Sequence, residues 1–102
     1  MNSNELYKNT KRRFDFARNK QLLREKYQSK LKIIYEGGMW EASPQLITLL
    51  SLYSDKESLV LEDLYQNPVK INPGELLGIV NQHWQEQMNA WLVEYENTGK
   101  ER

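Results

Sequence analysis

The sequence predicts an α+β fold of two long helices, one short helix and two antiparallel β-hairpins that form a small sheet. Two long stretches near the ends of the chain are rich in residues that favour helix. Between them lie two pairs of short apolar runs, each pair around turn residues, which is typical of hairpins. The length of 102 residues fits a single domain, 1–102, with one modest core.

The first predicted helix spans about residues 4–29, which contain no glycine or proline. Its apolar face is thin, because only Phe16, Leu23 and Tyr27 share one side at helical spacing. Residues 1–13 carry little apolar material. We therefore expect these residues to form a flexible basic extension of the domain.

The first predicted hairpin spans about residues 30–42. The run Ile33-Ile34-Tyr35 is β-branched and aromatic, and the Gly37-Gly38 pair that follows supplies a turn. In an alternative reading the first helix continues to Tyr35 and ends at Gly37. The hairpin is the preferred prediction, since β-branched neighbours disfavour helix.

The middle of the chain predicts a short helix and a second hairpin. Ser43-Pro44 is a good helix start, with Ser as the cap and Pro at the first helical position. The helix that follows, to Tyr53, is apolar on most sides, so we expect it to be buried. Residues 59–71 hold two apolar runs around Asn67-Pro68, and Pro68 should begin its strand or lie at a sheet edge.

The last predicted helix begins at the clearest local signal in the sequence. Asn72 is the expected N-cap, Pro73 the first helical residue, and Glu75 the residue that can reach back to the cap. The helix should end near Asn97, before Gly99. Gly78 would permit another element to approach closely. An apolar seam with steps of three and four residues runs along the helix: Leu77, Val80, Trp84, Met88, Trp91 and Tyr95.

The formal net charge of zero hides an asymmetry between two parts of the chain. Residues 1–35 hold ten cations and three anions, a net charge of +7. Residues 36–102 hold four cations and eleven anions, a net charge of −7. Such a split predicts pairing between the two parts, within one chain or between two, or a charged partner.

Other features of the composition limit the compartment and the class of protein. The absence of cysteine excludes a disulfide scaffold, a thiolate metal site and a cysteine nucleophile. No stretch is long and apolar enough to cross a membrane, and no signal peptide is visible. We therefore expect a protein of the cytoplasm, or of the host cytoplasm if it is viral, that does not bind membranes.

No catalytic, cofactor or metal site is visible in the sequence. His83 is the one histidine, and no serine lies in a Gly-x-Ser-x-Gly motif, so we interpret His83 as a residue on a helix flank or an interface. Glu62 and Asp63 are adjacent, which on a strand points them apart, and we interpret both as solvated residues near a turn. Gly37-Gly38 lacks the lysine of a phosphate-binding loop. A non-enzymatic protein without a cofactor is the prediction.

Two surfaces are candidates for binding. The basic helix, within residues 8–32, could contact phosphates or an acidic partner, or it could be a solvated face that pairs with the acidic last helix. Its candidate contact residues are Lys11, Arg12, Arg13, Arg18, Lys20 and Arg24. The seam of the last helix could be a protein interface, or it could be core. Its candidate residues are Trp84, Met88, Trp91 and Tyr95.

The run from Tyr35 to Ile47, with its glycine turn, aromatic residue and Ser-x-x-Leu-Ile, resembles short accessory proteins of large contractile-tailed phages of the marine, cyanophage type. Val60–Asp63 and Asn67–Ile71, followed by an aromatic helix, look like the same group. The resemblance covers about residues 30–96 and implies a viral assembly or host-takeover factor, without implying functional residues. We therefore expect an interaction protein with a protein partner or a second copy of itself, or alternatively a nucleic-acid-binding protein.

Overall fold

The protein is elongated, with a compact head at one end of a two-helix arm. The computed structural model describes the backbone of residues 3–100 and the side chains of residues 15–98. Its principal extents are 68 × 24 × 19 Å. The elements are α1 (Ser3–Ser29), β1 (Lys32–Tyr35), β2 (Gly38–Glu41), α2 (Pro44–Leu52), β3 (Leu59–Glu62), β4 (Pro68–Ile71) and α3 (Pro73–Lys100).

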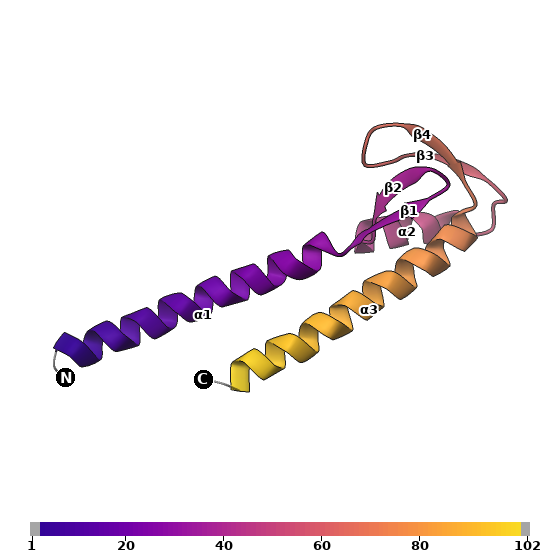
Figure 1. The fold of residues 1–102 in the computed structure, drawn as a ribbon. Helices are drawn as coiled ribbons and strands as arrows, with labels where there is room; N and C mark the ends of the chain where they lie inside the picture. Colours follow the sequence, from indigo (N-terminus) through magenta and orange to yellow (C-terminus); the bar gives the residue numbers. More distant parts are fainter. Residues whose placement is uncertain (1–2, 101–102) are drawn as a thin grey trace.

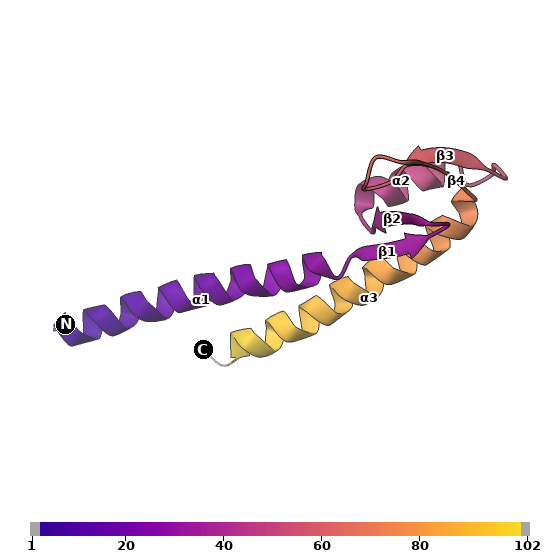
Figure 2. The same ribbon diagram turned by 45° about the horizontal axis from the view of Figure 1, so that its top comes forward.

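The arm consists of α1 and the part of α3 from residue 84 onward, and the head consists of residues 31–80. Figures 1 and 2 show α1 and α3 running in opposite directions, with the N-terminal end of α1 reaching beyond the C-terminal end of α3. Residues 3–13, expected to be an extension, continue α1 as helix. The predicted order of helix, hairpin, helix, hairpin, helix is confirmed.

The predicted caps begin α2 and α3. The backbone N–H of Leu46 donates to Ser43 Oγ at 3.1 Å, and that of Glu75 donates to Asn72 Oδ1 at 3.0 Å. Each bond satisfies an N–H that has no partner within its helix. The predicted end of α3 is wrong, because the helix continues through Gly99 to Lys100. Glycine permits the left-handed conformation that ends many helices but does not impose it.

The first hairpin is confirmed, and the alternative of a continued first helix is wrong. Strands β1 and β2 pair antiparallel, with Ile33 opposite Trp40 and Tyr35 opposite Gly38. The turn residues Glu36 and Gly37 have φ values of +52° and +77°. Positive φ at both positions is the geometry of the tight turn that matches the twist of a hairpin.

The two hairpins form two separate two-stranded sheets, so the predicted single sheet is wrong. In the second hairpin Leu59 lies opposite Ile71 and Pro68 begins β4, as predicted. The hairpins meet at Met39, whose carbonyl accepts a hydrogen bond from the N–H of Leu64 at 2.9 Å. Gln66, with φ of +65°, lies in the turn between β3 and β4, where its N–H donates to the carbonyl of Asp63.

Asp63 makes the second link between the hairpins, and its interpretation as a solvated residue is wrong. Its side chain is 7% exposed. Its Oδ2 accepts the N–H of Met39 at 3.0 Å, and its Oδ1 accepts the N–H groups of Tyr65 and Asn67 at 3.0 and 2.9 Å. The carboxylate thus orders its own loop and holds it against β2. Glu62, its neighbour, is exposed as predicted.

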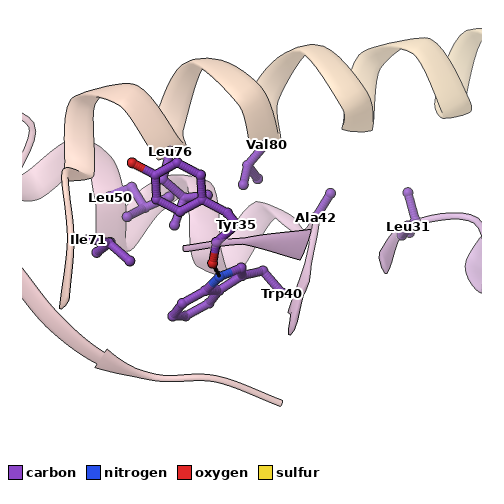
Figure 3. Close-up of a cluster of buried hydrophobic side chains, with 8 residues drawn as sticks. All are labelled: Leu31, Tyr35, Trp40, Ala42, Leu50, Ile71, Leu76 and Val80. Atoms are coloured by element: carbon purple, nitrogen blue, oxygen red, sulfur yellow. Dashed lines mark hydrogen bonds between the residues drawn. The ribbon is translucent and has the colours of Figure 1, made fainter. Parts of the chain in front are cut away.

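The core lies in the head, where both hairpins, α2 and the first turns of α3 meet (Figure 3). Its buried residues come from β1, β2, β4, α2, α3 and the segments beside the first hairpin: Leu31, Tyr35, Trp40, Ala42, Leu50, Ile71, Leu76 and Val80. The partly buried Leu59 and Leu61 of β3 pack against them. The indole Nε1 of Trp40 donates to the carbonyl of Tyr35 at 3.1 Å (Figure 3), so the buried N–H is satisfied. Apolar burial of this kind is the main force that holds a domain of this size together.

Helix α2 is not buried, contrary to the prediction from its composition. Leu50 is fully buried, but Leu52 is 72% exposed, and Leu49 and Tyr53 are also exposed. A small domain has too little chain to cover both faces of such a helix. The prediction that Gly78 permits a close approach by another element is also wrong, because a Cβ added there would meet no atom of another element within 4 Å.

Candidate functional site

The junction of α1 and α3 fixes the arm to the head. The His83 ring Nε2 lies 2.6 Å from the carbonyl oxygen of Lys30, which can only accept, so Nε2 donates. On α1, Leu23 and Tyr27 are buried. The predicted side of α1 therefore faces α3, and His83 sits on an interface between elements, as interpreted from the sequence.

An ion pair joins the two helices further along the arm. Lys26 Nζ lies 2.7 Å from Glu94 Oε1, and the Tyr27 hydroxyl donates to the same oxygen at 3.3 Å. The hydrogen bond with Glu94 raises the pKa of Lys26, and the same bond lowers the pKa of Glu94. Among the side chains of residues 15–98 this is the one ion pair, so the two oppositely charged parts of the chain pair only sparsely there.

The seam of α3 changes from core to surface along the helix. Val80 is buried in the head, and Trp84 and Met88 are half-buried against the core. Trp91 is half-buried, whereas Tyr95 is 39% exposed. The first turns of the seam therefore pack in the core, and its last turns lie at the surface, where the interpretation as a protein interface stays a prediction.

An apolar hollow of about 260 Å³ lies on the surface part of the seam. It is lined by Met88, Trp91, Leu92 and Tyr95, which we call the arm patch. Sequence reasoning found three of these residues and missed Leu92, which is 54% exposed. The signal was present, because Leu92 follows Met88 by four residues and precedes Tyr95 by three.

The three described basic candidates, Arg18, Lys20 and Arg24, do not form one stripe along α1. Arg18, Lys20 and Arg24 are exposed, whereas the side chains of Lys11, Arg12 and Arg13 lie outside the described residues. At about 100° per residue, Lys20 and Arg24 are neighbours, but Arg18 lies on the other side of the helix. A nucleic-acid site usually gathers its cations on one face.

The head carries a larger hollow of about 490 Å³ between β2, α2 and β3. Apolar side chains line most of it, including Trp40, Leu46 and Leu61, and the acidic Glu41 and Glu62 also contribute. Asp63 lines it too, but its oxygens already accept three backbone hydrogen bonds. The hollow therefore offers an apolar shape and two further carboxylates, those of Glu41 and Glu62.

Within the described residues, no three histidine or acidic side chains gather as they would to hold a metal ion. None of the helices in that part of the chain is long and apolar enough to span a membrane. The arm patch contains tryptophan, tyrosine and methionine, which are residue types enriched at protein interfaces. No protein-family model matches the sequence, and neither a curated protein nor a solved structure matches the chain.

Proposed function

We propose that the protein is a non-enzymatic interaction protein that binds a protein partner through the arm patch. The observation that carries the proposal is the apolar hollow on α3 beyond the head, where Leu92 is 54% exposed and Tyr95 39% exposed among the described side chains. Apolar side chains in contact with water cost free energy, and a partner that covers them recovers it.

The composition of the arm patch supports a protein partner. Tryptophan, tyrosine and methionine are the side chains enriched at protein interfaces, and tryptophan and tyrosine dominate their binding energy. The resemblance of residues 30–96 to phage accessory proteins suggests that the binding serves viral assembly or host takeover.

Substitutions on two sides of α3 test the proposal. Leu92→Glu and Tyr95→Glu place a charge in the arm patch, and Val93→Glu places the same charge on another side of the helix at a site that is 59% exposed. We expect full-length protein to retain bound partner from infected-cell extract when it carries Val93→Glu and to lose it with either patch substitution. Equal retention by all three variants, with equal thermal stability, would contradict the proposal.

A second candidate function is the binding of nucleic acid by α1, favoured by the exposed and unpaired Arg18, Lys20 and Arg24 in the described part of the helix. Substitution of Arg12, Arg13, Arg18 and Arg24 by alanine should then weaken binding to DNA or RNA and flatten its salt dependence. No binding by the unmodified protein at low salt would exclude this candidate.

A further inference from the structure

The side of the arm that carries the patch is open only at its far end. Near the head, Leu77, Trp84 and Met88 pack against the core, so the head itself covers the seam there. Beyond Met88 the patch continues to Tyr95, with Leu92 and Tyr95 exposed and Trp91 half-buried.

Helix α1 is longer than the part of α3 that it accompanies. Its 27 residues extend about 40 Å, whereas residues 84–100 of α3 extend about 25 Å. The N-terminal end of α1 therefore reaches past the end of α3, as Figures 1 and 2 show. Among the described residues, the first turns of α1 have no neighbouring helix at that level.

The two ends of the molecule differ in charge. The sequence of α1, residues 3–29, carries a net charge of +5, with eight cations and three anions. Residues 36–72, which make up most of the head, carry a net charge of −4, with two cations and six anions. The basic end of one molecule and the acidic head of another are thus complementary.

We infer that the arm patch binds the arm patch of a second copy of this chain in an antiparallel, two-fold symmetric dimer. The inference rests on the proposed function, because it names the partner of that surface. In the dimer the far turns of the two α3 helices pack against each other between Met88 and Tyr95. Each α1 then extends alongside the head of the partner subunit.

The antiparallel arrangement follows from the position of the head. In a parallel dimer both heads would lie at the same level, on the side of α3 that the dimer must bury, and would hold the patches apart. In the antiparallel dimer each free seam meets the other free seam, and the tip of each α3 reaches the level at which the head of the partner subunit begins. This arrangement also places the +5 helix next to the −4 head.

Mass measurement in solution tests the inference. We expect a mass of about 24 kDa, twice the 12.2 kDa of the chain, for full-length protein at about 100 µM, where a micromolar affinity is nearly saturated. Leu92→Glu or Tyr95→Glu should raise the dissociation constant at least about tenfold, and Val93→Glu should leave it unchanged. A monomer at this concentration, or a dimer that all three variants leave intact, would overturn the inference.

The absence of cysteine allows a direct test of the orientation. A spin label on Lys56→Cys, an exposed site in the head, gives one label in each subunit. In the antiparallel dimer the two labels are separated by at least the length of the free arm, about 25 Å. A short label-to-label distance would show a parallel dimer and would overturn the arrangement.

Salt and charge reversal test the contact of α1 with the partner's head. Arg12→Glu with Arg13→Glu should weaken the dimer and remove part of its salt dependence. An unchanged dimer would contradict the contact. If the protein is a monomer and Leu92→Glu abolishes its binding to a protein from the extract, the dimer is overturned and the proposed function stands. If the protein is a monomer and Leu92→Glu changes no binding, both are overturned.

Discussion

Asp63 and Met39 are joined across the two hairpins by a hydrogen bond of 3.0 Å, in which the backbone N–H of Met39 donates to Asp63 Oδ2. The other carboxylate oxygen accepts the N–H groups of Tyr65 and Asn67. A single side chain therefore orders the β3–β4 loop and attaches it to β2. The hairpins do not share a ladder. Among the described residues, two hydrogen bonds to the backbone of Met39 join them: its N–H donates to Asp63, and its carbonyl accepts from the N–H of Leu64.

Substitution Asp63→Asn should destabilise the head clearly. The amide nitrogen would meet the Met39 N–H, donor against donor, and a buried N–H without an acceptor is costly. We expect the melting temperature to fall by several degrees in thermal unfolding followed by circular dichroism. Glu62→Gln is the matched control, because Glu62 is exposed and should change the melting temperature little. Equal effects of the two substitutions would show that the Asp63 bonds do not support the fold.

The same carboxylate should make stability depend on acid pH. Hydrogen bonds from the N–H groups of Asn67 and Met39 lower the pKa of Asp63 below its ordinary value of 3.8, against the opposing effect of burial. The folded state thus binds this proton more weakly than the unfolded state. The stabilising contribution is complete above the ordinary pKa and is lost as the pH falls through the lowered pKa of the folded state.

Urea unfolding between pH 2 and pH 6, about the range in which carboxylates titrate, measures this dependence. We expect the free energy of unfolding to fall toward acid pH in the unmodified protein, and to fall less steeply in Asp63→Asn. The hydrogen bond with Lys26 also lowers the pKa of Glu94, so Glu94 adds to the loss of stability toward acid pH. Identical slopes for the two proteins would assign the acid sensitivity to groups other than Asp63.

Local signals in the sequence predicted the elements of the fold well. The Ser43 and Asn72 caps, the turn before Gly38 and the start of β4 at Pro68 each depend on a few neighbouring residues. Such signals act over one turn of helix or one hairpin, and the residue types alone report them. The thin apolar side of α1 at Leu23 and Tyr27 was predictable for the same reason.

Features that depend on distant parts of the chain were not predictable. The role of Asp63 requires Met39, which lies 24 residues away in the sequence. The exposure of Leu52 depends on how much of α2 the rest of a small domain can cover. The arm patch was predicted in part, since helical spacing groups its residues. Where the seam changes from core to surface depends on how far the head extends along α3, and the last seam residue that packs against the core is Met88.

Gly78→Ala should stabilise the protein. Gly78 lies in the interior of α3, and a Cβ added there would meet no atom of another element within 4 Å. Alanine in a helix interior is favoured over glycine by about 0.5–1 kcal/mol, and we expect a gain of this size in urea unfolding. Gly38→Ala is the contrast, because its Cβ would lie 3.1 Å from Trp40 Nε1 and from Val69 Cγ2. A loss with Gly78→Ala would mean that the glycine serves a contact absent from this structure.

His83→Phe should loosen the arm from the head. The substitution keeps a ring but removes the donor to the Lys30 carbonyl, which lies at the point where α1 ends and the first hairpin begins. A partly exposed hydrogen bond of this kind is worth about 1 kcal/mol or less, so the protein should stay folded. Hydrogen exchange followed by mass spectrometry should show faster exchange over the last turns of α1, with the core strands unchanged. His83→Gln, whose amide can donate to the same carbonyl, should restore slow exchange. If His83→Gln and His83→Phe exchange alike, packing of the ring rather than its hydrogen bond attaches α1 to α3.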